Sequence, residues 1–143
     1  MRKLVVPLLL AVGLLALLAG CSSPPLTGFT IELQKIEKAS DGTLLATARL
    51  VNPNVVAYNV DSSTHSLYLD GKLAGTLSTS GAEGVPAQGS VMTTAKFATA
   101  PGFVLTAGKA SYRLESVLVM RLYGDSTEKQ KLTSTGTVEI VTK

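Results

Sequence analysis

Alternation of apolar and polar residues, broken by a proline, most limits what this chain can fold into. Over residues 44–50 one parity is apolar and the other carries Thr47 and Arg49; the apolar set is Leu44, Ala46, Ala48 and Leu50. A period of two residues predicts a strand with one buried face. Pro53 ends this strand, because proline has no N–H for a ladder and pushes Asn52 out of the helical region. The chain must therefore turn at residues 52–54.

The next apolar sets predict a hairpin closed by Asp70 and Gly71. With only these two residues in the loop, Tyr68 would face Leu73 and the apolar sets would lie on opposite faces. We therefore predict a three-residue loop, Leu69 to Gly71, with Gly71 in the left-handed conformation. In that register Leu67 and Leu73 pair on one face, followed by Leu77.

Further strands are predicted over residues 29–38, 91–97, 112–122 and 132–140, each with one apolar parity. Ile36 breaks the parity of Phe29, Ile31 and Leu33, which predicts a bulge or the strand end. Residues 104–109 form either a short helix or an irregular link. About seven short strands, with turns at intervals of roughly ten residues, predict an all-β fold, an antiparallel β-sandwich.

Several motifs together resemble the late embryogenesis abundant type 2 domain, also called the water stress and hypersensitive response domain. In chain order they are Asn52-Pro53-Asn54, Tyr58-x-Val60, Leu67-x-Leu69-Asp70-Gly71-Lys72-x-Ala74-Gly75, Val85-Pro86-Ala87-x-Gly89, Tyr112-Arg113-Leu114 and Ser134-Thr135-Gly136-Thr137-Val138. The resemblance covers Leu33 to Ile140. It implies a β-sandwich similar to fibronectin type III and immunoglobulin modules, and it marks Asn52, Pro53, Asn54, Asp70, Gly71, Pro86 and Gly89 as motif residues. One departure is Glu115, where many members carry glycine.

The first 21 residues predict a signal peptide. Arg2 and Lys3 precede an apolar run of about 15 residues, short of the roughly 20 that span a bilayer as a helix. The tetrad Leu18-Ala19-Gly20-Cys21 resembles a bacterial lipoprotein box, which implies cleavage before Cys21 and its acylation. The alternative is an ordinary secretory signal with an incidental cysteine. Ser22, rather than aspartate, favours the outer membrane by resemblance to the bacterial sorting rule.

This interpretation divides the chain into a signal peptide with a helical core (1–20), a tether (21–28) and one domain (29–143). The net charge of +3 includes Arg2 and Lys3; without them, 11 Lys and Arg stand against 10 Asp and Glu, or +1. Because no basic stripe remains and aromatic residues are few, we expect no nucleic-acid partner. With a single cysteine, the chain can form no internal disulfide.

No catalytic group, metal site or cofactor is predicted. Glu32 with Glu37, or Asp41 with Asp61, could form paired carboxylates, but outward parity and turns favour solvated side chains. His65 is the single histidine and shares the parity of Leu67, so we expect a partly buried spacer rather than a base or ligand. Among the serines, Ser78, Ser80 and Ser90 lie in turn-like runs without a nucleophile elbow.

These observations predict a lipid-anchored, non-enzymatic envelope protein in the outer membrane, on its periplasmic face. The resemblance implies a part in desiccation and water-stress tolerance through weak protective contacts with other macromolecules. An alternative is an adaptor that docks onto an envelope complex through an edge strand or the loop 79–89. A carrier of lipids or small ligands ranks lower, because a sandwich of this size fills its core with side chains.

Overall fold

The computed structural model describes residues 28–121 and 126–142, and every regular element in these ranges is a β-strand. The strands are β1 (Thr30–Lys38), β2 (Leu44–Asn52), β3 (Tyr58–Leu69), β4 (Lys72–Val85), β5 (Gly89–Thr99), β6 (Gly108–Arg121) and β7 (Thr127–Val141). The all-β prediction is therefore confirmed. Of the segment 104–109, predicted as a short helix or an irregular link, residues 104–107 form an irregular link and residues 108–109 begin β6. The predicted signal-peptide helix lies outside the described residues.

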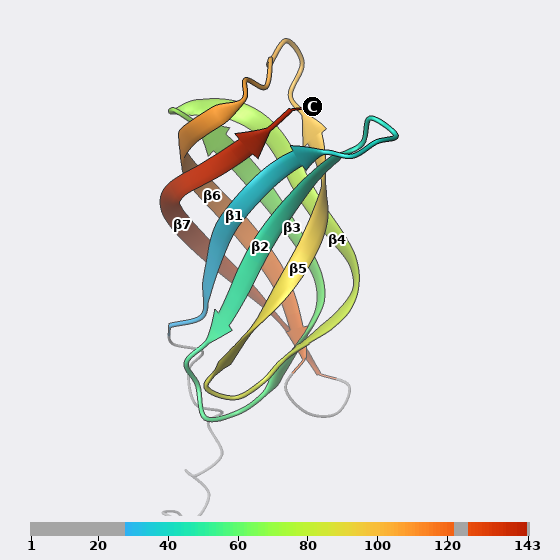
Figure 1. Ribbon diagram of the computed structural model, residues 1–143. Coiled ribbons are helices and arrows are strands. Elements are labelled where there is room, and N and C mark those ends of the chain that lie inside the picture. The colour runs from blue at the N-terminus through green and yellow to red at the C-terminus, as the bar shows by residue number, and fades with distance from the viewer. Residues whose placement is uncertain (1–27, 122–125, 143) are drawn as a thin grey trace, which may run out of the picture.

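The seven strands form a closed barrel, not the predicted sandwich, in the order β1-β2-β5-β4-β3-β6-β7 (Figure 1). Long antiparallel ladders build two groups, β1-β2-β5 and β4-β3-β6-β7. Two short ladders join these groups: Gly75–Ser78 of β4 pairs with Lys96–Thr99 of β5, and Lys35–Glu37 of β1 pairs in parallel with Glu139–Val141 of β7. The sandwich prediction was wrong because alternation shows which face is buried but not whether two sheet edges meet.

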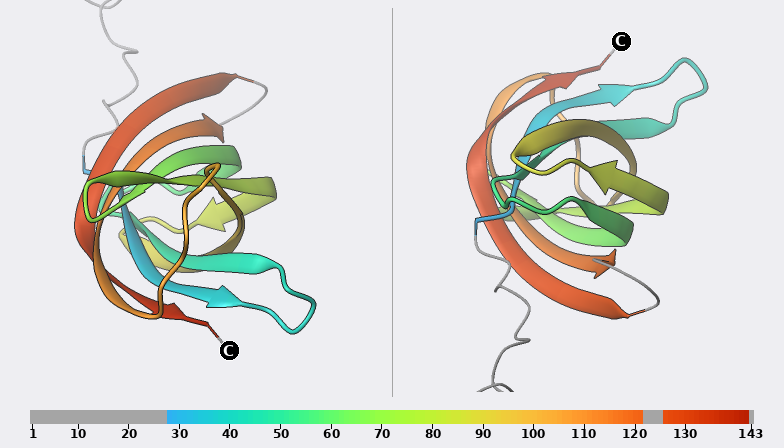
Figure 2. Two further views of the ribbon diagram at one scale, coloured as in Figure 1. Left: turned by 90° about the horizontal axis from the view of Figure 1, so that it is seen from above. Right: turned by 90° about the horizontal axis from the view of Figure 1, so that it is seen from below.

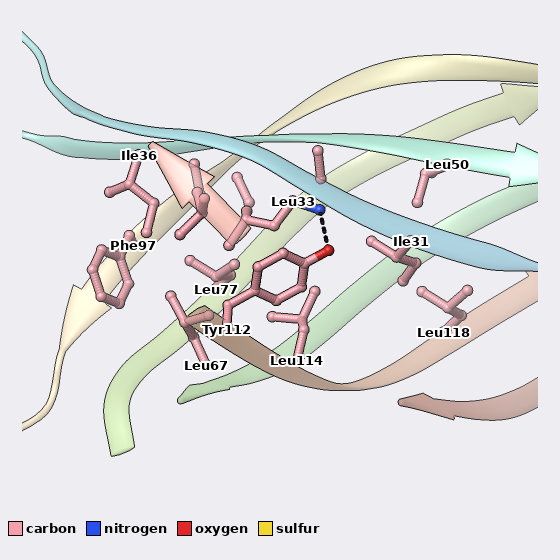
Figure 3. Close-up of a cluster of buried hydrophobic side chains, with 14 of the residues drawn as sticks. Ile31, Leu33, Ile36, Leu50, Leu67, Leu77, Phe97, Tyr112, Leu114 and Leu118 are labelled. Carbon is pink, nitrogen blue, oxygen red and sulfur yellow. Dashed lines mark hydrogen bonds between the residues drawn. The ribbon is translucent and has the colours of Figure 1, made fainter. Parts of the chain in front are cut away.

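The predicted irregularity in β1 is confirmed as a β-bulge. The register with β2 shifts between Leu33 and Lys35, and both Leu33 and Ile36 are buried. Next to the bulge, the backbone N–H of Leu33 donates a hydrogen bond of 3.1 Å to the Tyr112 hydroxyl, which crosses the interior from β6 (Figure 3). Tyr112 therefore connects the two strand groups from inside.

The β3–β4 hairpin differs from the prediction. Leu69 pairs with Lys72, so the loop holds only Asp70 and Gly71, with φ of 46° and 80°. Positive φ at both residues is the turn geometry that suits the twist of a hairpin. The left-handed Gly71 is confirmed, but the three-residue loop is wrong. A bulge after Leu67 resolves the parity conflict instead: Leu67 pairs with Gly75, and Leu73 remains 48% exposed.

Figure 2 shows the ribbon of the barrel from both ends. Side chains from all seven strands fill its interior. The largest fully buried apolar side chains are Ile31, Ile36, Leu67, Leu77, Leu114, Leu118, Met120, Val85 and Val138. On β5 the predicted inward face is confirmed, since Ala95 and Phe97 are buried while Met92 is exposed. The interior is a packed core, as expected when one apolar parity of each strand turns inward.

Candidate functional site

The predicted motif residues lie at both ends of the barrel. We call the end near Gly28, with loops 53–57 and 86–88, the tether end, and the opposite end the far end (Figure 1). Asn52, Pro53, Asn54, Pro86 and Gly89 come together at the tether end, whereas Asp70 and Gly71 form a turn at the far end. The seven residues therefore form two separate structural features.

Asn52 is the centre of the tether-end group, and its side chain is fully buried. Its amide nitrogen donates hydrogen bonds to the carbonyl oxygens of Val56 (2.8 Å) and Pro86 (3.0 Å). Its side-chain oxygen accepts from the backbone N–H of Asn54 at 3.0 Å, which is an Asx turn. A buried amide can satisfy all of these backbone groups at once, so one side chain fixes the turn and joins it to the β4–β5 loop.

The other motif residues complete this joint, which we call the Asn52 corner (Asn52–Asn54 and Val85–Gly89). Asn52 pairs with Gly89 in the β2–β5 ladder, and the Asn54 carbonyl accepts from the N–H of Gln88 at 2.8 Å. A Cβ atom at Gly89 would lie 2.7 Å from Pro86, which explains why the close packing needs glycine. The polar atoms of Asn52 are occupied within the fold, so the corner is a structural joint rather than a reactive site.

At the far end, Asp70 joins the β3–β4 turn to the start of β6. Its carboxylate accepts hydrogen bonds from the Ser111 N–H (3.0 Å) and hydroxyl (2.8 Å), and its own N–H donates to the Ser111 carbonyl (2.9 Å). This predicted motif residue is therefore also structural.

Sequence reasoning missed a chain of polar side chains that runs from β6 through β3 to β4. Its members Ser116, His65 and Ser63 are buried, and Thr79 is half buried. His65 Nδ1 lies 2.7 Å from the Ser116 hydroxyl, and Nε2 lies 2.8 Å from the Ser63 hydroxyl. The Ser63 hydroxyl also bonds Thr79 at 2.6 Å. Ser63 and His65 lie two residues apart on one strand, which was a signal that their side chains share a face. Their partners on β6 and β4 could be found only once the pairing of these strands with β3 was known.

Burial lowers the pKa of His65 to about 4, because a charged imidazole in the barrel would lose its hydration. His65 is 5% exposed and Ser63 is 7% exposed. The prediction of a partly buried spacer underestimated this burial. Although serine and histidine lie at hydrogen-bond distance, a substrate would have to enter the packed barrel to reach the hydroxyl, and Thr79 already bonds that oxygen.

The carboxylates considered as acid–base pairs each have other partners. Glu32 pairs with Arg49 (3.0 Å), Glu37 with Lys35 (2.5 Å) and Asp61 with Arg121 (2.7 Å). Asp41 accepts from the Thr43 N–H, which lowers the pKa of its carboxyl below the ordinary value. In residues 28–121 and 126–142, no group of three or more His, Cys, Asp or Glu could hold a metal ion.

Surface clefts lie at the far end and between two strands of the described chain. One of about 760 Å³ lies between the β1–β2 turn and Val141, and one of about 400 Å³ lies under the loop 103–107, both at the far end. The third, of about 450 Å³, lies between β4 and β5. We call it the β4–β5 cleft, and its lining is Ser78, Thr79, Gly81, Ala82, Glu83, Met92, Thr93, Thr94 and Lys96.

The predicted lipid-attachment residue, Cys21, and the signal segment 1–20 lie outside the described residues. The described chain begins at Gly28, whose Cβ, if present, would lie 2.9 Å from Pro53. Gly28 thus lies beside the Asn52 corner. None of the described elements is a helix with the length and apolar character to cross a membrane.

The fold and the corner define a small β-barrel protein whose loops are held by buried asparagine. No protein-family profile matches the chain, and no curated protein matches it. The solution structure of AT1g01470 from Arabidopsis thaliana is similar, with a TM-score of 0.51 and 12% identity over 87% of this chain and 91% of that protein. The chain therefore shares its overall fold with AT1g01470.

Two further solved structures are similar at lower TM-scores. A crystal structure of a protein from Archaeoglobus fulgidus has a TM-score of 0.46 and 12% identity, over 78% of this chain and 97% of that protein. The solution structure of At2g46140.1, described as a late embryogenesis abundant (LEA) protein, has a TM-score of 0.39 and 10% identity, over 79% and 71%. The structural neighbours thus include a LEA-like protein.

Proposed function

We propose that this chain is a lipid-tethered, non-enzymatic protein of the cell envelope that contributes to survival of water stress through weak protective contacts. The tether would be an acylated Cys21, and the outer membrane, on its periplasmic face, would be its location. The protected partners would be other envelope macromolecules that lose hydration. The observation that carries this proposal is the Asn52 corner.

The corner supports the proposal because it brings together motif residues that are far apart in the sequence. Asn52–Asn54 and Val85–Gly89 are two of the motifs that resemble the water-stress domain, and the hydrogen bonds from Asn52 explain why these two segments occur together. A shared structural joint is a stronger reason for the resemblance than separate short motifs. The function itself comes from the resemblance, since a fold alone does not determine function.

The burial of the polar chain supports a non-enzymatic role. Ser63 and Ser116, the two serines that lie beside His65 as a nucleophile lies beside a base, are enclosed in the barrel together with it. The exposed ion pairs are solvated and join opposite charges, so they do not provide the separated acid and base that hydrolysis needs.

Survival on drying tests the proposed role. A strain lacking this chain should grow normally in liquid medium and lose viability faster than its parent after drying and rehydration. The wild-type chain should restore survival, and Cys21→Ala should restore it incompletely because the protein is no longer held at the membrane. Equal survival of the deletion strain and its parent would contradict the proposal.

Fatty-acid labelling tests the tether separately. The wild-type chain should incorporate labelled palmitate and appear as a shortened product, whereas Cys21→Ala should remain an unlabelled precursor. Ser22→Ala is the matched control and should be labelled like wild type. A labelled product from Cys21→Ala would show that the lipid is not attached at this residue.

A further inference from the structure

Two loops at the tether end expose apolar side chains and contain no charged residue. Residues 53–57 read Pro-Asn-Val-Val-Ala and residues 86–88 read Pro-Ala-Gln, so Lys, Arg, Asp and Glu are missing from both. Val55, in the middle of the first loop, is 78% exposed, and Pro53, Ala57, Pro86 and Ala87 are exposed as well. Both loops lie at the lower end of the barrel in Figure 1, and we call them together the tip (53–57 and 86–88).

The backbone of the tip forms several hydrogen bonds within the protein. The Asn54 carbonyl accepts from the Gln88 N–H at 2.8 Å, and the Pro86 carbonyl accepts from the side-chain amide of Asn52 at 3.0 Å. Pro53 and Pro86 have no backbone N–H that would need a partner. A polar group that is bonded internally loses less free energy when it leaves water than one that is bonded to water. The tip is therefore suited to an environment with little water.

The far end of the barrel differs from the tip in charge. Val104, in the loop 103–107, is 80% exposed and so matches Val55 in exposure. However, the cleft under its loop is lined by Asp70, Lys72 and Lys109. A charged group that enters the apolar layer of a membrane loses its hydration, whereas an uncharged loop does not have this cost. Of the two ends, the tip is thus the one that suits a lipid surface.

The start of the described chain lies next to the tip. A Cβ atom at Gly28 would lie 2.9 Å from the side chain of Pro53. In the proposed function Cys21 carries the lipid, and residues 21–27 extend over at most about 25 Å, so the lipid and the tip reach the same membrane surface. Because such an anchor holds the protein at this surface, a small apolar contact is sufficient to orient the barrel.

From these observations we infer that the tip binds the surface of the membrane that holds the lipid anchor, with Val55 between the headgroups and the acyl chains. The partner of this surface is a lipid bilayer. The contact holds the barrel upright, with its far end directed away from the membrane. The inference rests on the proposed function, because it takes the acylated Cys21 from it and identifies the part of the barrel that faces the membrane.

Paramagnetic broadening of methyl signals tests this inference with the natural side chains. The full acylated chain is placed in phosphatidylcholine bicelles, some of whose lipids carry a nitroxide near the top of the acyl chain, and is observed by NMR. The methyl signals of Val55 should broaden at least about fivefold more than those of Val104, because only Val55 reaches the nitroxide layer. Val104 is the matched control, since it is a valine of equal exposure in a loop at the other end.

Two aspartate variants separate binding by the tip from mere closeness that the tether imposes. Val55→Asp should reduce the broadening of the Ala57 methyl signal at least about threefold, because a carboxylate keeps the loop in water. Val104→Asp makes the same change at the far end and should leave the Ala57 signal as in wild type. Both positions are exposed, so neither variant should alter unfolding in urea. Equal Ala57 broadening in wild type and Val55→Asp would overturn the inference.

Two other results would also overturn it. The first is equal broadening of Val55 and Val104 in the acylated protein. The second is a shift of the Val55 signals that grows with protein concentration in detergent micelles without lipid, since it would assign the tip to a second copy of the chain. Either result would contradict this inference alone, because palmitate labelling and survival on drying test the proposed function separately.

Discussion

Acid should destabilise this protein through His65. Burial lowers the pKa of His65 in the folded state to about 4, compared with 6.5 for an exposed histidine. As the pH falls below about 6.5, the unfolded state takes up the proton first, so stability falls. The loss is complete below about pH 4, and above pH 6.5 the group has no effect. The difference in pKa corresponds to about 3 kcal/mol of unfolding free energy.

Urea unfolding followed by circular dichroism between pH 4 and pH 7.5 measures this loss. His65→Gln keeps hydrogen-bonding groups near Ser63 and Ser116 but cannot titrate. Between pH 7.5 and pH 4, the unfolding free energy of His65→Gln should therefore fall by about 3 kcal/mol less than that of wild type. Subtracting the two profiles removes the contribution of carboxylates, which titrate in both proteins.

Thr64→Gln is the matched control, because Thr64 is an exposed neighbour on the opposite face of β3. Its pH profile should follow that of wild type. Parallel profiles of wild type and His65→Gln would refute the reasoning, since the imidazole would then titrate equally in the folded and unfolded states.

Three further substitutions test the joints of the barrel by urea unfolding at pH 7. Asn52→Ala should lower the unfolding free energy by about 3 kcal/mol, because it leaves buried backbone groups without partners. Its control, Asn59→Ala at an exposed position, should change this free energy by less than about 0.5 kcal/mol. Similar losses in the two variants would contradict the role of the corner. Tyr112→Phe should cost about 1 kcal/mol through the lost bond to Leu33, and an unchanged stability would contradict it. Gly75→Ala should cost about 3 kcal/mol or more, because its Cβ would lie 2.1 Å from the Ala98 carbonyl oxygen. Its control, Gly84→Ala, has no contact closer than 3.5 Å, and equal effects would show that the close approach at Gly75 is not needed.

The sequence predicted those parts of the fold that depend on neighbouring positions. Period-two alternation located the strands and the buried face of β5, and the parity break at Ile36 located the bulge in β1. Proline and asparagine at 52–54 located the corner, since their backbone preferences act within a few residues. The contacts of Asn52 with Val56 and Pro86 gave this corner its structural role.

Features that depend on residues far apart in the chain were not predictable in this way. The hairpin register was wrong because an odd-length loop and a bulge both resolve the same parity conflict, and the apolar pattern does not distinguish them. The polar chain could not be predicted without the strand register that places Ser116 and Thr79 beside β3. Barrel closure needed a close approach of backbones at Gly75, where any side chain would meet Ala98.

The position of the short ladders connects the fold with the proposed role. Both closing ladders lie toward the far end, while the chain enters at Gly28 beside the corner. Residues 21–27 can extend over at most about 25 Å, so an acylated Cys21 would hold the tether end near the membrane surface. The loops 53–57 and 86–88 lie at this end of the barrel, so the Asn52 corner would also lie close to the membrane. The protected macromolecules would then be those near that surface, and lengthening the tether by about 20 flexible residues should reduce protection on drying while the stability of the barrel in urea stays unchanged.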